Sequence, residues 1–242
     1  MGTRTTLNRA LSKLGLCSRT DAIKLIQEGK IVVNNKRATT HLMWIDTTKD
    51  NIILRTSNIS KENTKTPIIH SEPKLYLAMY KPKGYITTKS DEYGRKTVYN
   101  LLPKQYHNTW IFPVGRLDKD SEGLLLLTND GEWQNDILDP QSHLKKTYNV
   151  WVTKHLTPEK IKKLERGIIL GSYQLEPCTI NTEQDHYTIT ISEGKNRQVR
   201  KMMEYVGTEV TKLERIKIGK LTLNETGLKP GETIEIDPNI LF

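Results

Sequence analysis

The residues with the clearest potential for chemistry lie between Gly115 and Gly131. Asp118 follows Arg116 by two residues and precedes a run of four leucines at 124–127. A short apolar run bounded by turn residues predicts a buried strand, so Asp118 should lie at the end of a core element that fixes its position. A fixed, ionised carboxylate can act as a nucleophile or as an acid–base group, and a neighbouring arginine would lower its pKa.

Two alternatives would use the same acidic residues to bind a metal ion. The spacing of Asp118, Asp120, Glu122 and Gly123 matches the first half of a calcium-binding EF-hand loop. The twelfth position, however, is Asn129 and the intervening residues are leucines, which excludes calcium. A metal cluster for phosphoryl transfer, as in a nuclease, would need a second acidic motif, and the sequence has none of matching character. We therefore expect no metal site.

A second arginine for Asp118 could come from the segment at 193–203. This segment is a turn that leads into a basic helix expected at 196–206. The start of such a helix could equally contact a phosphate. Tyr148 lies on an expected strand with alternating apolar residues, and its spacing alone favours a place in the core.

The charge distribution favours an anionic partner. The 242-residue chain has a net charge of +9, and residues 1–60 hold ten Lys and Arg against four Asp and Glu. Charge that is this one-sided is typical of phosphate binding, and nucleic acid is the first candidate. The basic residues expected to contact RNA in this part are Arg4, Arg9, Arg19, Lys24, Lys30, Lys36 and Arg37.

The first part of the chain predicts a small α+β domain at 1–58. Helical spacing begins at Leu7 and ends at Gly15, Ser18 has the position of a helix N-cap, and a strand at 31–33 is followed by an Asn34-Asn35 turn. Residues 59–73 are rich in Ser, Asn, Thr, Lys and Pro without periodicity, which predicts a linker.

Residues 74–242 predict a larger domain in which several strands alternate with a few helices. Strands are expected at 75–79, 148–152 and 187–191 and between 216 and 223, and a helix is expected from Thr157-Pro158 to Gly167. This pattern is typical of an α+β sheet domain.

Several segments together resemble the bacterial ribosomal-RNA pseudouridine synthases that carry an amino-terminal S-four RNA-binding domain. Each segment alone is a weak match, but their order along the chain is specific. The matching segments are 7–11, 17–22, 81–88, 115–131, 146–148 and 193–202. The resemblance implies a mixed, mainly antiparallel β-sheet catalytic domain with flanking helices, linked to the small N-terminal domain.

The resemblance also implies roles for individual residues. Asp118 takes the position of the essential aspartate, Tyr148 that of an aromatic stacked on the target base, and Arg200 that of a basic residue paired with the aspartate. Arg116 would lie beside the flipped nucleotide, and Arg197 and Lys201 would contact RNA. Asp118 could bond to C1′ of the sugar, bond to the base, or assist proton loss from C2′.

The expected reaction converts a uridine of ribosomal RNA, of the large subunit in preference to the small, to pseudouridine. Because it moves a glycosidic bond from N1 to C5 without redox change, no cofactor is expected. The expected partner is ribosomal RNA or an assembling ribosomal particle, and the protein is expected to be a monomer. It should be cytoplasmic, since no apolar run approaches the ~20 residues that span a bilayer. The rival hypothesis is a non-catalytic RNA-binding protein of ribosome assembly.

Overall fold

A computed structural model describes residues 4–14, 16–55, 73–107 and 109–242. They divide into two compact units, which are described separately. The first consists of Met1–Leu75, Asn108–Ile111 and Asn129–Glu132, and the second of Tyr76–His107, Phe112–Thr128 and Trp133–Phe242. The expected linker at 59–73, except Pro73, and the expected helix end at Gly15 lie outside the described residues, so the boundary at residue 58 stays a prediction.

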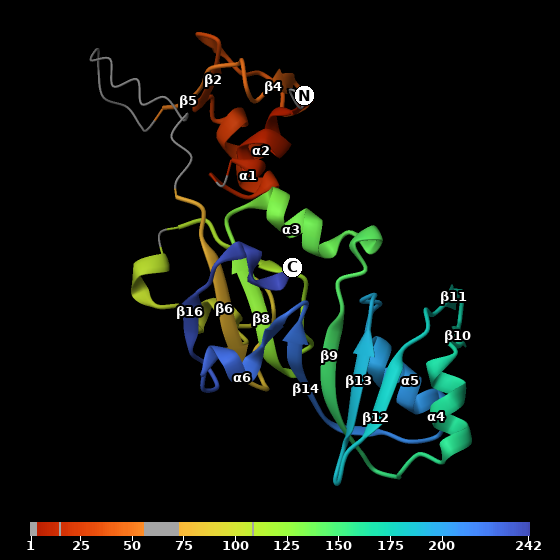
Figure 1. Ribbon diagram of the computed structural model, residues 1–242. Coiled ribbons are helices and arrows are strands. Elements are labelled where there is room, and N and C mark those ends of the chain that lie inside the picture. Colours follow the sequence, from red (N-terminus) through yellow and green to blue (C-terminus); the bar gives the residue numbers. More distant parts are fainter. Residues whose placement is uncertain (1–3, 15, 56–72, 108) are drawn as a thin grey trace. The chain divides into compact units, whose positions relative to one another are not determined.

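The first unit is a small α+β domain built on two short helices (Figure 1). Ser18 caps the second helix as expected, because its hydroxyl accepts a hydrogen bond from the backbone N–H of Asp21 at 2.9 Å. The elements in order are β1 (Arg4–Thr6), α1 (Leu7–Lys13), α2 (Arg19–Gln27), β2 (Ile31–Val33), β3 (Lys36–Arg37), β4 (Trp44–Asp46) and β5 (Ile52–Leu54).

The core of this unit lies between its helices and its strands. Leu7, Ala10 and Leu11 of α1 are at most 1% exposed and pack with Ala22 and Ile26 of α2 in one apolar cluster. The predicted turn between β2 and β3 is confirmed, since Asn34 and Asn35 both have positive φ, 49° and 64°. Such a pair of left-handed residues forms the tight hairpin turn that matches strand twist.

The second unit is organised around a mixed sheet, whose strands follow the order β12-β13-β9-β14-β8-β6-β16 (Figure 1). In addition, β15 pairs with β14 and β7 pairs with β8. The β14–β8 pair is parallel, whereas the other pairs are antiparallel. The bounds are β6 (Tyr76–Lys81), β7 (Phe112–Val114), β8 (Glu122–Thr128), β9 (Lys146–Val152), β12 (Thr179–Thr182), β13 (Tyr187–Ile191), β14 (Val210–Ile218), β15 (Leu221–Thr222) and β16 (Thr233–Glu235). This confirms the predicted α+β class and the mixed, mainly antiparallel sheet.

Helices and short hairpins flank this sheet. Thr157 caps α4 and Pro158 is its first residue, as expected. Figure 1 shows α4 and α5 beside the end of the sheet that holds β12 and β13. The elements are α3 (Gly131–Leu138), α4 (Pro158–Glu165), α5 (Gln198–Tyr205) and α6 (Leu223–Thr226), the 3-10 helices η1 (Val98–Leu101), η2 (Lys104–Tyr106), η3 (Pro140–Ser142) and η4 (Pro238–Leu241), and the hairpin β10 (Ile169–Leu170) and β11 (Tyr173–Gln174).

Strand β8 is the centre of the core. The four leucines at 124–127 are all 0% exposed, as expected for a strand that neighbours cover on both faces. Gly123 lets β14 approach closely: it has a φ of +104°, and a Cβ there would lie 2.6 Å from the backbone nitrogen of Arg215 and closer still to its carbonyl oxygen. The core strand and its neighbour are thereby held in one register just after Asp118.

Three local expectations differ from the structure. Leu223 was expected on a strand but begins α6 after a capping box formed by Thr222 and Glu225. Helix α5 begins at Gln198, since Arg197 has a φ of 52° and cannot continue a helix. Strand β6 is buried on both faces and does not alternate. No helix among the described residues has the length and apolar character needed to cross a membrane.

Candidate active site

The loop between β7 and β8 carries Asp118, and Thr87, in the segment that follows β6, holds the conformation of this loop. The hydroxyl of Thr87 donates a hydrogen bond to the carbonyl oxygen of Leu117 at 2.7 Å, and the backbone N–H of Leu117 donates one to the oxygen of the same hydroxyl at 3.2 Å. Thr87 is 7% exposed and Leu117 6%. This buried two-way contact clamps the residue just before Asp118.

The turn after Asp118 is held by two buried cations. The N–H of Ser121 donates to the carbonyl oxygen of Asp118 at 3.1 Å. The ammonium of Lys81 donates to the carbonyl oxygen of Ser121 at 2.6 Å, and the Nη2 of Arg200 donates to that of Asp120 at 3.0 Å. The position of Asp118 is therefore set by backbone contacts on both sides of it.

Lys81 is 0% exposed, which is unusual because lysine side chains are almost never fully buried. Burial lowers its pKa to about 8, although the carboxylates of Asp118, Asp120 and Glu122 act in the opposite direction. Its hydrogen bonds to two carbonyl oxygens, of Pro82 and Ser121, replace part of the lost hydration.

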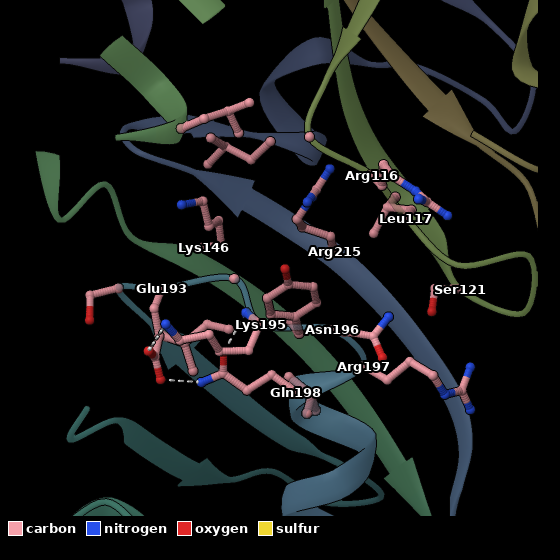
Figure 2. A pocket seen from close by; sticks show the side chains of 18 of the residues that line it. Arg116, Leu117, Ser121, Lys146, Glu193, Lys195, Asn196, Arg197, Gln198 and Arg215 are labelled. Atoms are coloured by element: carbon pink, nitrogen blue, oxygen red, sulfur yellow. Dashed lines mark hydrogen bonds and ion pairs between the residues drawn. The ribbon is translucent and has the colours of Figure 1, made fainter. Parts of the chain in front are cut away.

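A pocket of about 550 Å³ lies beside this loop (Figure 2). This volume is in the range of small-molecule sites. Its walls come from the β7–β8 loop, the end of α3, the β9, β13 and β14 strands and the β13–α5 connection. The lining includes Arg116, Leu117, Asp118, Ser121, Lys146, Tyr148, Glu193, Lys195, Asn196, Arg197, Gln198 and Arg215.

Asp118 is half-buried at the wall of this pocket and forms an ion pair with Arg197. The Nη1 of Arg197 lies 3.5 Å from the Oδ2 of Asp118, and the two side chains are 42% and 32% exposed. The resemblance implied that Arg200 would pair with this aspartate. Among the described residues Arg197 is the one within ion-pair distance, so that expectation needs correction.

The physical reason is that Arg200 is occupied elsewhere. It is 7% exposed, and its guanidinium donates to the carbonyl oxygens of Asp120 and Val210. Burial lowers the pKa of Arg200, and the neighbouring charge of Arg197 acts in the same direction, whereas the carboxylates of Asp118 and Asp120 oppose them. Arg200 thus acts on Asp118 through the backbone and through its field, and its catalytic assignment stays a prediction.

Tyr148 lies in the core, as its spacing predicted, and it also lines the pocket, whereas its stacking on a base stays a prediction. It is 8% exposed and therefore a core residue of β9, yet it also lines the pocket together with Asp118. An aromatic ring at a pocket wall offers a face on which a nucleobase can stack.

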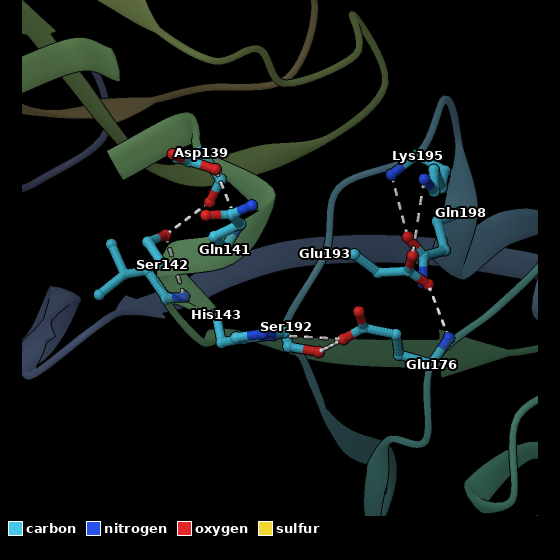
Figure 3. Close-up of polar contacts among 10 residues, drawn as sticks. Asp139, Gln141, Ser142, His143, Glu176, Ser192, Glu193, Lys195 and Gln198 are labelled. Atoms are coloured by element: carbon cyan, nitrogen blue, oxygen red, sulfur yellow. Dashed lines mark hydrogen bonds and ion pairs between the residues drawn. The ribbon is translucent and has the colours of Figure 1, made fainter. Parts of the chain in front are cut away.

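The β13–α5 connection is shaped by Glu193 (Figure 3). Its Oε1 accepts a hydrogen bond from the amide of Gln198 at 2.7 Å, and its Oε2 lies 3.9 Å from the ammonium of Lys195. Gln198 in turn accepts from the N–H of Lys195 at 3.0 Å. These contacts hold the turn from which Arg197 reaches Asp118.

The remaining predicted RNA-binding residues lie in three settings. Arg116 is exposed and lines the pocket, whereas Lys201 is exposed and does not line it. In the first unit Arg4, Arg9, Arg19, Lys24, Lys36 and Arg37 are exposed, and Lys30 is half-buried with an ion pair to Glu28 at 2.7 Å. Their role in RNA binding stays a prediction.

Sequence reasoning missed several residues of the site. Those that lay in recognised motifs without an assigned role are Lys81, Thr87, Lys146 and Glu193, and Arg215 was not considered. The signal for Arg215 was its place on β14 between Leu213 and Ile218, where inward positions are otherwise apolar. In the described part of the chain, no three His, Cys, Asp or Glu side chains gather where they could hold a metal ion.

Comparisons with known proteins identify the family of this chain. The family described as RNA pseudouridylate synthase matches residues 75–205, and the S4 domain matches residues 5–41. The ribosomal large subunit pseudouridine synthase B of Bacillus subtilis (strain 168) is 37% identical, over 96% of this chain and 92% of that protein. The dual-specificity RNA pseudouridine synthase RluF of Escherichia coli (strain K12) is 34% identical, over 93% of this chain and 73% of that protein.

A solved structure supports the same conclusion over the whole length. A crystal structure of a pseudouridylate synthase covers 98% of this chain and 97% of its own, with a TM-score of 0.68 and 26% identity. The pocket that holds Asp118 and Tyr148 lies almost entirely within the part matched by the family. The chain belongs to the RNA pseudouridylate synthase family and carries an S4 domain ahead of its catalytic domain.

Proposed function

We propose that the protein isomerises a uridine of large-subunit ribosomal RNA to pseudouridine, with Asp118 acting at the sugar of a flipped-out nucleotide. One observation carries the assignment of the site: a rigidly held carboxylate and a buried aromatic ring line the same pocket, which is large enough for a nucleobase. The choice of large-subunit ribosomal RNA is supported by the name of the relative from Bacillus subtilis, a ribosomal large subunit pseudouridine synthase.

The reaction breaks the bond between uracil N1 and ribose C1′ and forms one between C5 and C1′. The carboxylate of Asp118 stabilises or takes up the electron deficiency of the sugar while the base is detached. The guanidinium of Arg197 forms an ion pair with this carboxylate and helps to hold it at the wall of the pocket. The ring of Tyr148 keeps the detached base in the pocket while it turns.

The rigidity of the loop gives this chemistry its geometry. Thr87, Lys81 and Arg200 hold the backbone on both sides of Asp118 by hydrogen bonds of 2.6 to 3.0 Å. A reacting group that is fixed before the substrate arrives loses little entropy in the transition state.

The substrate must leave its stack to reach this pocket. Flipping a base out of structured RNA costs a few kcal/mol, which phosphate contacts must offset. We assign these contacts to the basic residues of the S4 domain and to Arg116 and Lys201 at the catalytic domain. Target choice then follows from RNA shape around the flipped base.

The proposal is tested by mapping pseudouridines in ribosomal RNA from a strain that lacks the gene. We expect the loss of a modification in the large-subunit RNA, its return with the wild-type gene, and no return with Asp118→Asn. Asp120→Asn is the matched control, since its carboxylate is exposed in the same loop and outside the pocket lining, and it should restore the modification. An unchanged set of pseudouridines in the strain without the gene would overturn the proposal.

A further inference from the structure

Arg215 presents a buried hydrogen-bond donor for which the described residues offer no acceptor. The residue lies on β14, is 5% exposed and lines the pocket. Its Nε donates to the carbonyl oxygen of Leu124 at 2.7 Å, which fixes the side chain. Its Nη2 is buried, and no acceptor among the described residues reaches it. A buried donor without an acceptor is costly and points to a ligand that supplies one.

The positive charge around Arg215 favours an electron-rich group as the acceptor for its Nη2. Lys146 lines the same pocket (Figure 2), and burial, together with the charge of Arg215, lowers its pKa. The four carboxylates that line the pocket are engaged elsewhere. Asp118 pairs with Arg197, and Glu193 binds Gln198 and Lys195. Asp139 accepts a hydrogen bond from the N–H of Gln141, and Glu176 accepts one from the hydroxyl of Ser192. Lys146 and Arg215 therefore both line the pocket, and among the described residues no ion pair neutralises the charge of either side chain.

The position of Arg215 relative to Tyr148 identifies the part of the substrate that would meet it. The two residues are directly paired between β14 and β9, so a base stacked on the Tyr148 ring lies within the reach of the Arg215 side chain. A phosphate would stay with the RNA backbone at the mouth of the pocket, where Arg116 and Arg197 are exposed. Because Arg215 is buried, the base that enters the pocket is better placed than a phosphate to accept its hydrogen bond.

We infer that Arg215 donates through its free Nη2 to a carbonyl oxygen of the flipped uracil and holds the negative charge that the base carries while it is detached. This inference rests on the proposed isomerisation, because only a base released from the sugar develops that charge. Lys146 adds a second positive charge to the same wall of the pocket.

The electron balance explains why a fixed cation is useful here. When the C1′–N1 bond breaks, its electron pair stays with uracil and spreads over N1, O2 and O4. The ring turns, C5 bonds to C1′, the proton on C5 leaves to solvent, and N1 takes up a proton. Arginine keeps its own proton throughout, so Arg215 acts only as a donor and a charge. Preorganised donors aimed at developing negative charge provide the largest catalytic effect in many enzymes.

The test compares Arg215→Ala with wild type on unmodified large-subunit ribosomal RNA transcribed with C5-tritiated uridine. At saturating protein, we expect single-turnover tritium release to fall by about 10²–10³-fold, the loss seen for removal of one such donor. Affinity for the RNA and its salt dependence should stay at wild-type values. Arg166→Ala, which removes an exposed arginine outside the pocket, should change none of these quantities.

Two further measurements separate catalysis from structure. Added guanidinium ion should restore part of the rate of Arg215→Ala, but not that of Asp118→Asn, and sodium chloride of equal ionic strength should restore none. If Arg215→Ala fails to fold, Arg215→Lys replaces it. Its ammonium can keep the bond to Leu124 but has no second arm to reach the base, so the same loss of rate is expected.

The outcomes that overturn the inference are distinct. A folded variant that releases tritium at the wild-type rate contradicts it. A variant with a normal saturating rate, weaker binding and a salt slope reduced by about 0.7, the value for one phosphate contact, places Arg215 on the RNA backbone and also contradicts it. If wild type releases no tritium, the proposed function fails before the role of Arg215 is addressed.

Discussion

Replacing Gly123 by alanine should destabilise the catalytic domain at the point where its core strand meets β14. Gly123 has a φ of +104°, and an added Cβ would lie 2.6 Å from the backbone nitrogen of Arg215. Neither the backbone conformation nor the close approach suits an alanine. Since the obstacle is backbone of a central strand, it cannot move aside as a flexible side chain would.

The magnitude follows from two contributions. A left-handed conformation costs a non-glycine residue about 1–2 kcal/mol. Forcing the strands apart adds about 1–3 kcal/mol, as in other overpacked cores. The sum is a loss of about 2–5 kcal/mol in the free energy of unfolding. The gain from restricting the unfolded chain, about 0.4–1 kcal/mol, offsets a small part of it.

Gly84→Ala provides the matched control. Gly84 has a φ of +95°, and nothing lies within 4 Å of the Cβ it would gain, so it carries the conformational cost without the collision. Urea unfolding followed by circular dichroism should show Gly123→Ala as the less stable variant by about 1–3 kcal/mol. Equal destabilisation by the two substitutions would refute the close approach of β14 as the reason for a glycine here.

Three other predictions concern burial, pH and RNA binding. Burial raises the pKa of the Cys178 thiol to about 11, whereas the thiol of an unfolded chain has a pKa of about 8.5. At about pH 8, iodoacetamide should therefore alkylate Cys178 at least ~100-fold more slowly in the native protein than in the unfolded protein. Equal rates in mass-spectrometric peptide mapping would contradict this. Burial lowers the pKa of Lys81 to about 8, so the unfolded chain binds more protons than the folded chain between about pH 8 and pH 10. The free energy of unfolding of wild type relative to Lys81→Met should therefore rise with pH over that range. If urea unfolding gives the same difference in stability between the two proteins at each pH, this prediction is refuted. Deleting residues 1–58 should weaken RNA binding and reduce its salt dependence while leaving tritium release at saturating protein nearly unchanged, and an unchanged affinity in filter binding would exclude the assigned role.

Elements with strong local signals could be predicted from the sequence. The four-leucine run, the Ser18 and Thr157 caps and the Asn34-Asn35 turn each depend on a few neighbouring residues, and the structure confirms them. The fold class followed from the order of strands and helices. The start of α5 was placed too early because the left-handed conformation of Arg197 leaves no mark in the residue pattern.

The site was less predictable because its contacts cross the sheet. Asp118 and Tyr148 could be chosen from motifs, and the structure brings them to one pocket. That Asp118 meets Arg197 in place of Arg200 depends on where α5 begins and on two carbonyl oxygens that Arg200 binds. The free donor of Arg215 depends on strand register, which no local pattern reveals.

The central claim is that the carboxylate of Asp118 moves the glycosidic bond of a flipped uridine. It is tested most directly by tritium release from C5-labelled uridine in large-subunit ribosomal RNA by purified Asp118→Asn protein. The account predicts that release falls to background while the RNA affinity of the variant stays at the wild-type value. Release at a rate near that of wild type would contradict it.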